Sequence, residues 1–183
     1  MLTTLLLPDP EQLQLLEEIS LEMGKLILKV IATQESYGCP NCGRKSTRVH
    51  SQYQRQLSDL PCVWIPVRII WTVRRFFCEN PKCRRETFVE QIPVVAARYA
   101  RKTCRLRQQQ TEIGFTVGGE PGAKLAYRLE IPTSADSLLN MVRKTPEQDI
   151  KTPKILGVDD LAIRKGKTYG TILIDLATRQ PVN

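Results

Sequence analysis

Two close-spaced pairs of cysteines constrain the fold of this chain more than any other feature. The first pair is Cys39 and Cys42, in the run Cys-Pro-Asn-Cys-Gly, and the second is Cys78 and Cys83, with a proline turn between them. Two thiolates at either spacing can reach one ion, and the glycine after the first pair permits the backbone turn that directs amides toward the sulfurs. The sequence therefore predicts a tetrahedral four-cysteine zinc site.

Zinc with four protein ligands has no open coordination position, so we expect the metal to be structural. Reduced core cysteines or two disulfides are the alternative, which is disfavoured because the chain shows no export signal. Cys62 and Cys104 have no partner at ligand spacing and are expected to be ordinary thiols. His50 can replace a cysteine as ligand, but with four cysteines present a local hydrogen bond or a contact to DNA fits it better.

The charge of the chain favours a polyanionic partner. The formal net charge is +8 and the isoelectric point is near 9.3. Nucleic acid is the leading candidate, and a merely basic soluble protein is the alternative. No stretch has the length and apolarity of a membrane span, so we expect a protein of the cytoplasm, associated with the nucleoid and not with a membrane.

The first half of the chain reads as β-structure. Residues 17–33 alternate apolar and polar around Gly24, which predicts two strands and a turn. Residues 48–57 and 67–77 are also strand-like, and the second stretch is rich in β-branched and aromatic residues. We predict a β-rich zinc-binding domain over residues 1–92.

Basic residues dominate the stretch between the two cysteine pairs. Arg74 and Arg75, beside two phenylalanines, are candidates to contact DNA phosphates. Because side chains alternate along a strand, one of each neighbouring pair must point toward the core. About half of these charges are therefore expected to be simply solvated surface.

Residues 93–148 are expected to form a helix-turn-helix segment. A basic stretch with helical spacing ends at Gly118 and Gly119, and Arg101, Lys102 and Arg105 are expected to contact phosphates. From Glu120 the pattern predicts helix, tight turn, helix, with Ser134 or Thr133 capping the second helix.

The second of these helices is expected to enter the major groove of duplex DNA. Its polar candidates for DNA contact are Ser134, Ser137, Asn140, Arg143 and Lys144. Asparagine and arginine are chemically suited to adenine and guanine edges. An ordinary helical hairpin in a core is the alternative, and the basic neighbours favour the DNA interpretation.

After Pro153, residues 155–163 and 169–176 predict two strands joined by a polar turn. With these strands, the chain resembles the ISL-three family of bacterial insertion-sequence transposases. The matching stretches are collinear and cover most of the chain: residues 39–43, 49–53, 74–78, 118–122, 156–160 and 167–171.

This resemblance implies an α+β, multi-module protein. Its parts are the zinc-binding domain, a helix-turn-helix for the terminal repeats of the element, and, over residues 149–183, the first hairpin of a ribonuclease-H-like DDE domain. Such domains use three carboxylates to hold two divalent ions, such as magnesium. Asp159 matches the first carboxylate. Asp160 points to the opposite face of the strand, so only one of the two can serve, and Asp160 is the alternative. The sequence ends before the other carboxylates, so we expect no DNA cleavage by this chain alone.

The sequence as a whole predicts a catalytically incomplete, DNA-binding amino-terminal portion of a transposase that recognises insertion-sequence ends in duplex DNA. A regulator or inhibitor of transposition, acting as a homo-oligomer or together with full-length transposase, is the second interpretation. A zinc-stapled interaction or RNA-binding module is the third, and it requires that duplex DNA bind no better than single strands or RNA.

Overall fold

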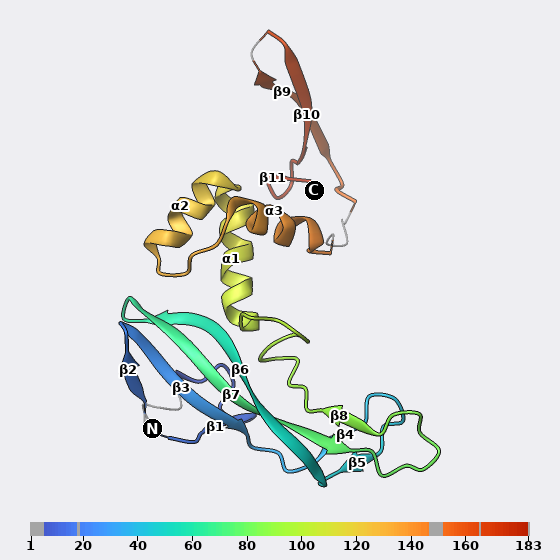
Figure 1. Cartoon of the computed structure of the whole chain (residues 1–183). Coiled ribbons are helices and arrows are strands. Elements are labelled where there is room, and N and C mark those ends of the chain that lie inside the picture. Colours follow the sequence, from blue (N-terminus) through green and yellow to red (C-terminus); the bar gives the residue numbers. More distant parts are fainter. Residues whose placement is uncertain (1–5, 18, 147–151, 165, 183) are drawn as a thin grey trace. The chain divides into compact units, whose positions relative to one another are not determined.

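The computed structural model describes residues 6–17, 19–146, 152–164 and 166–182 of the chain (Figure 1). Residues 1–144 form one compact unit and residues 145–183 form a second. The predicted division at residue 92 stays a prediction. The architecture is mixed α+β, with a β-rich amino-terminal region followed by three helices, as the sequence indicated.

A six-stranded sheet is the base of the first unit. Its central strands run in the order β1-β3-β7-β6, while β2 pairs with β3 and β8 pairs with β7. The pair β3 and β7 is parallel, and the other pairs are antiparallel. The strands are β1 (Leu13–Leu15), β2 (Ser20–Glu22), β3 (Lys25–Ala32), β6 (Val49–Cys62), β7 (Ile65–Phe77) and β8 (Thr87–Val89). They confirm the strands predicted around Gly24 and in residues 48–57 and 67–77.

Strand β7 shows why this sequence forms a sheet. Its β-branched and aromatic residues alternate, so that Val67, Ile69, Trp71 and Val73 are all buried on one face. These side chains pack against buried residues of β1, β3 and β6. Each such burial contributes about 1.5–3 kcal/mol, so this face supplies the main core of the unit.

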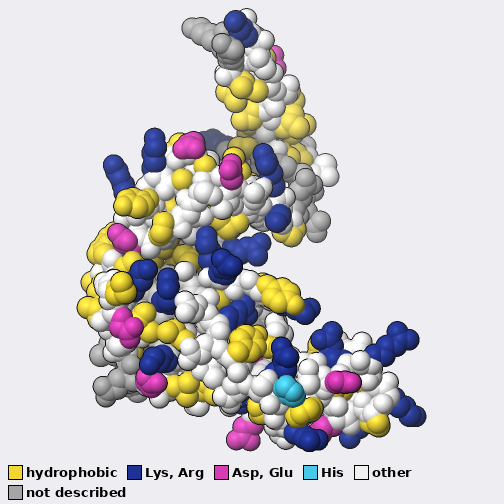
Figure 2. All heavy atoms as spheres, in the orientation of Figure 1, with side chains coloured by type: hydrophobic (Ala, Val, Ile, Leu, Met, Phe, Trp, Pro, Cys, Tyr) yellow, Lys and Arg dark blue, Asp and Glu magenta, His cyan; other side chains and the backbone are white. Residues whose placement is uncertain are grey.

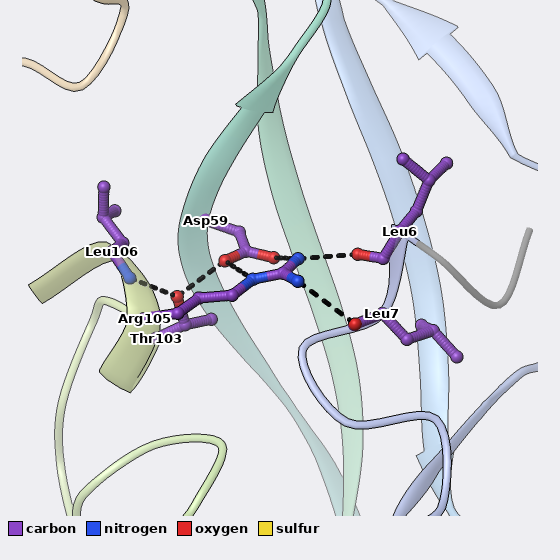
Figure 3. A network of polar contacts seen from close by, with 6 residues as sticks. All are labelled: Leu6, Leu7, Asp59, Thr103, Arg105 and Leu106. Atoms are coloured by element: carbon purple, nitrogen blue, oxygen red, sulfur yellow. Dashed lines mark hydrogen bonds and ion pairs between the residues drawn. The ribbon is translucent and has the colours of Figure 1, made fainter. Parts of the chain in front are cut away.

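A hydrogen-bonded cluster around Asp59 joins the sheet to the first helix, α1 (Cys104–Val117), as Figure 3 shows. Asp59 on β6 is buried, and its Oδ1 accepts hydrogen bonds from Thr103 Oγ1 (2.6 Å) and Arg105 Nε (2.8 Å). Arg105 also donates to the carbonyl oxygens of Leu6 and Leu7. The amino-terminal segment, the sheet and the start of α1 are therefore fastened at one point.

Thr103 has a second role in the same cluster, as the N-cap of α1. Its Oγ1 accepts a hydrogen bond from the backbone N–H of Leu106. Gly118, with φ of 80°, ends the helix, because glycine adopts this conformation without steric cost.

The helices α1, α2 (Glu120–Arg128) and α3 (Ala135–Lys144) pack on one another at small residues. A Cβ atom on Gly114 of α1 would lie 2.9 Å from Val142 Cγ2 of α3, and one on Gly122 of α2 would lie 2.8 Å from Leu138 Cδ1. Leu138 is fully buried. The glycines therefore let the helix axes approach closely around one leucine.

The second unit is a three-stranded antiparallel sheet in the order β11-β10-β9. Its strands are β9 (Leu156–Arg164), β10 (Thr168–Asp175) and β11 (Gln180–Pro181). The two strands expected after Pro153 are thus confirmed, while Lys165, in the predicted turn between them, lies outside the described residues.

None of the helices in the described part of the chain is long and apolar enough to cross a membrane.

Candidate metal centre and nucleic-acid interface

The first cysteine knuckle is a tight turn between the short strands β4 (Tyr37–Gly38) and β5 (Lys45–Ser46). The backbone N–H of Cys39 donates to the carbonyl of Arg44, and the N–H of Gly43 donates back to the carbonyl of Cys39 (2.8 Å). Gly43 has φ of 74°, a left-handed conformation that permits the turn expected after the first pair.

The second knuckle follows directly on β7 and returns into β8. The N–H of Cys78 donates to the carbonyl of Glu86 (2.7 Å), and the N–H of Cys83 donates to the carbonyl of Asn80. Arg85 N lies 3.5 Å from Cys83 Sγ and donates to it. Backbone amides thus point at sulfur in this knuckle.

The parallel pairing of β3 and β7 explains why the two knuckles meet. Parallel strands end at the same edge of a sheet, and each cysteine pair follows the carboxyl end of one of these strands. Phe76 and Phe88 are buried together with Cys39 beneath the cluster, and their rings stack with centroids 5.8 Å apart. A small apolar core therefore supports the site.

The four cysteine sulfurs lie within 4.8 Å of one another. The separation is 4.0 Å between Cys39 and Cys83 and 3.6 Å between Cys42 and Cys78. Zinc–sulfur bonds of about 2.3 Å at tetrahedral angles place sulfurs about 3.8 Å apart. The cluster is therefore close to the geometry of a tetrahedral zinc site, and its four thiolates would complete the coordination.

Hydrogen bonds in the cluster favour the thiolates that such an ion needs. The backbone amide of Arg44 lowers the pKa of Cys42, and the backbone amide of Arg85, with the side chain of Asn41, lowers the pKa of Cys83. At Cys78 the backbone amide of Asn80 acts in the same direction, but desolvation and the neighbouring cysteines raise the pKa to about 12. Several negative sulfurs at this distance repel one another until a cation binds.

The remaining cysteines and the histidine lie outside the cluster. Cys104 Sγ donates a hydrogen bond to the carbonyl of Pro93. His50 Nδ1 lies 2.9 Å from Ser51 Oγ, and the imidazole ring contacts Phe77 edge-on. His50 therefore has the local hydrogen bond expected of it.

Figure 2 shows Lys and Arg side chains gathered over the end of the first unit that carries β4, β5 and β8. Among the arginines predicted to contact DNA phosphates, Arg75 and Arg101 are exposed. Arg74, one residue before Arg75, points to the other face of β7. Its Nε donates to buried Glu90 Oε2 over 2.8 Å, and its guanidinium also donates to the carbonyl of Gln34.

Two other predicted phosphate contacts also have partners inside the protein. Arg105 pairs with Asp59, as described above. Lys102 Nζ donates to Gln110 Oε1 (2.7 Å) and Thr133 Oγ1 (3.3 Å), and desolvation lowers the pKa of this lysine. In this structure both side chains hold the start of α1 in place.

The polar residues predicted for the second helix of the pair lie at and along α3. Ser134 precedes the helix and caps it, since its Oγ accepts a hydrogen bond from the N–H of Ser137 (3.2 Å). Asn140, Arg143 and Lys144 are exposed, and Ser137 is partly exposed. The connection from Leu129 to Ser134 is longer than the turn of about three to four residues common in helix-turn-helix units.

The two predicted carboxylates lie in the second unit. Asp159 and Asp160 are neighbours on β9, opposite Ile172 and Thr171 of β10, and both are exposed. Asp159 Oδ1 accepts a hydrogen bond from the N–H of Asp160 (2.8 Å). Side chains alternate along the strand, so each face of β9 receives one of the two carboxylates.

Sequence reasoning did not find the acidic partners of the predicted DNA contacts. Glu90 and Asp59 are both fully buried and each holds an arginine that the sequence alone presented as free charge. Glu90 lies just beyond the second cysteine pair, at alternating spacing with Phe88. Because residues two apart in a strand share a face, this spacing could have indicated that the Glu90 carboxylate points inward.

Comparison with known proteins shows that the four-cysteine cluster lies in a segment that matches a known protein family. Residues 36–83, which contain all four cysteines, match the family model described as the zinc-finger of transposase IS204/IS1001/IS1096/IS1165. The chain is also 26% identical over 148 residues to the "Transposase for insertion sequence element IS1001" of Bordetella parapertussis. The match covers 78% of this chain and 34% of the relative, so the chain spans about a third of the length of that protein. No solved structure matches significantly.

The matched zinc finger contains the whole four-cysteine cluster, and the relative matches the sequence well beyond it. The two findings confirm the predicted resemblance to the ISL-three family of insertion-sequence transposases.

Proposed function

We propose that this chain is the DNA-binding amino-terminal portion of a DDE transposase and that it recognises the ends of an insertion sequence. The observation that carries the proposal is the four-thiol cluster, which fits zinc and lies within a segment matched by a transposase zinc finger. The charge of +8 and the similarity to a transposase support a nucleic-acid partner.

Zinc has a structural role in this proposal. The ion would be held by Cys39, Cys42, Cys78 and Cys83. It would cross-link the segments that follow β3 and β7. The exposed basic residues of the knuckles, such as Lys82, Arg84 and Arg85, then form a fixed surface beside the exposed end of β6. A surface of this kind suits phosphate contacts that position DNA without reading its sequence.

Helix α3 is the proposed reading element of a helix-turn-helix formed with α2. Asn140, Arg143 and Lys144 provide amide, guanidinium and ammonium groups on an exposed helix, chemistry that matches base edges and phosphates. Ser134 and Ser137 contribute chiefly by fixing the start of the helix.

The phosphate contacts are assigned to Arg75 and Arg101, which are exposed. Arg74, Lys102 and Arg105 are assigned a positioning role, because their charged groups have partners inside the first unit. We propose the same three-part division as the sequence suggested, at residues 1–92, 93–148 and 149–183, with residues 149–183 as the beginning of a ribonuclease-H-like domain.

Asp159 is the proposed first carboxylate of the transposase active site, with Asp160 as the alternative. Magnesium, held by the carboxylates of a complete site, would activate the attacking oxygen and stabilise the leaving one. Because β9 offers one carboxylate to each face, we propose that the 183-residue chain binds DNA without cutting it. Magnesium-dependent cleavage by the purified chain would disprove that part of the proposal.

The proposal is tested by measuring binding to a DNA duplex that carries the terminal repeat of the insertion sequence that encodes this chain. We expect tighter binding to that duplex than to a shuffled duplex, and a steep loss of affinity as salt rises, because phosphate contacts release counterions. Arg143→Ala should cost about 1–3 kcal/mol on the repeat only, whereas Arg101→Ala should weaken both duplexes alike. Equal affinity of the unaltered chain for both duplexes would contradict end recognition.

A further inference from the structure

A groove of about 950 Å³ lies between the zinc knuckles, the sheet and the segment that precedes α1. Pro40 of the first knuckle and Arg85 of the second contribute to its wall, and Tyr53 and Arg75 contribute from β6 and β7. The residues that line it include five arginines, and no described lining residue is acidic. The groove is therefore a concave, positively charged surface with aromatic groups in it.

The face of the sheet that forms this groove is a continuation of the core face. On β6, Tyr53 and Arg55 lie on the same face as buried Leu57, because residues two apart in a strand share a face. On β7, Arg75 likewise shares the face of buried Val73. Tyr53 and Arg75 lie on this face beyond the buried residues, and both are exposed. Side chains at these positions are directed into the groove by the sheet itself.

The far wall of the groove is a turn that Arg55 fastens to the sheet. One terminal nitrogen of Arg55 donates to the carbonyl oxygens of Ala97 (2.6 Å) and Ala100 (2.7 Å). The N–H of Ser58 on β6 donates to the carbonyl of Arg101 over 2.9 Å. These hydrogen bonds tie the turn to β6 on both sides of Tyr99.

This turn presents an aromatic ring in an unusual way. Tyr99 has φ of 61°, a left-handed conformation that is costly for a tyrosine, and its side chain is 81% exposed. The guanidinium of Arg98 lies over the ring, 4.7 Å from its centroid. A bulky residue is therefore kept on a strained backbone and pointed away from the core, which packing of the first unit does not explain.

We propose that this groove binds a single-stranded segment of DNA, with its phosphates on Arg75, Arg85 and Arg101 and a base stacked on Tyr99. This inference rests on the nucleic-acid binding proposed above and deepens it. Bases in a duplex are covered by their neighbours, whereas an unpaired base offers a free face to an aromatic ring. Charge along a groove together with exposed tyrosines is the combination that single strands use.

Binding of a labelled oligothymidylate of about 12 nucleotides by the full 183-residue chain tests the proposal. Replacing Tyr99 with glycine removes the ring and suits the positive φ, so the turn keeps its shape. We expect Tyr99→Gly to weaken oligothymidylate binding about ten-fold and to change duplex binding less than about two-fold. Tyr99→Phe keeps the ring and should bind as the unaltered chain does.

Tyr127→Ala is the matched control, because Tyr127 is exposed on α2 and does not line the groove. It should leave oligothymidylate binding unchanged. Zinc content and circular dichroism establish that each variant is folded, and Tyr99→Asn, which also tolerates this backbone conformation, provides a second ring deletion. Unchanged oligothymidylate affinity in Tyr99→Gly, or an equal loss on single strand and duplex, overturns the proposal.

The outcome separates this inference from the proposed function. Repeat-specific duplex binding without an effect of Tyr99→Gly overturns the groove as a single-strand site and leaves end recognition intact. Loss of single-strand binding in Tyr99→Gly, in a chain that does not distinguish the repeat from a shuffled duplex, supports the groove and contradicts end recognition.

Discussion

Lys102 Nζ donates a hydrogen bond of 2.7 Å to Gln110 Oε1, and Gln110 is fully buried. Gln110 Nε2 in turn donates to the carbonyl of Ile131 over 2.9 Å. These contacts connect Lys102, two residues before α1, with Gln110 of α1 and with the connection between α2 and α3. A lysine that the sequence presented as a DNA contact therefore organises the three-helix part of the chain.

Replacing Lys102 with methionine should destabilise the fold. The variant keeps most of the length of the side chain but leaves the buried Gln110 Oε1 without its donor, which costs about 1–3 kcal/mol. Urea denaturation followed by circular dichroism measures the change. Arg107→Met, at an exposed position of α1, is the control and should unfold at nearly the same urea concentration as the unaltered chain.

The effect of Lys102→Met should also depend on pH. Desolvation lowers the pKa of Lys102 from its ordinary value of 10.5, so the folded chain holds this proton less tightly than the unfolded chain. Between the lowered value and 10.5 the unfolded chain binds more protons, and this group's contribution to the free energy of unfolding therefore rises with pH. The stability difference between the unaltered chain and the variant should widen toward pH 10.5, and a constant difference would contradict the assignment.

Removing one ligand thiol should release the metal. Cys42→Ser leaves three thiolates for a zinc ion that requires four protein ligands, so we expect the bound zinc, measured by plasma mass spectrometry, to fall from about one per chain to near zero. Cys62→Ser is the matched control, because Cys62 lies outside the cluster. A reduced, freshly purified chain that contains no zinc before any substitution would argue against the site.

The buried ion pair of Arg74 and Glu90 should contribute more to the stability of the fold than an exposed ion pair does. Glu90→Ala leaves the arginine, whose side chain is only 12% exposed, without its carboxylate, a change that costs about 3–5 kcal/mol for a buried pair. Glu17→Ala breaks the exposed pair with Lys29 and should leave the thermal midpoint close to that of the unaltered chain. Similar midpoints for the two variants would show that Glu90 is not needed to neutralise Arg74.

Gly114→Ala should destabilise the helices although alanine is the better helix former. Alanine improves helix propensity by about 0.5–1 kcal/mol, but its methyl group would lie 2.9 Å from Val142 Cγ2, and overpacking costs about 1–3 kcal/mol. Gln108→Ala, at an exposed position of the same helix, is the control and should be neutral or slightly stabilising. The thermal midpoint should therefore fall for Gly114→Ala and stay equal or rise slightly for Gln108→Ala.

Local sequence signals predicted much of this fold. The cysteine spacings predicted the knuckles, and the left-handed backbone of Gly43 permits the turn expected there. Alternation predicted the strands of the main sheet, and helical spacing with Gly118 predicted the end of α1. Each of these signals depends on residues a few positions apart, where one side chain or one backbone angle determines the outcome.

The partners of individual charges were not predictable in the same way. Arg105 and Asp59 are 46 positions apart, and whether an arginine meets a carboxylate at that distance depends on how the sheet and α1 pack. The parallel pairing of β3 and β7 likewise leaves no local pattern, although it brings the cysteine pairs together. Charge counts therefore overestimated the number of basic side chains that are free of partners inside the protein.

The parallel pairing of β3 and β7 also has a kinetic consequence. Parallel strands cannot nucleate from a hairpin, and here all of β6 and the first knuckle must be accommodated before they meet, so the entropy of closing a long loop opposes assembly. A metal ion that joins Cys39 to Cys78 closes that loop at the edge where both strands end. Zinc would thus accelerate folding as well as oppose unfolding. A newly made chain without metal would fold slowly, and its unpaired strand edges would stay exposed to other chains for longer.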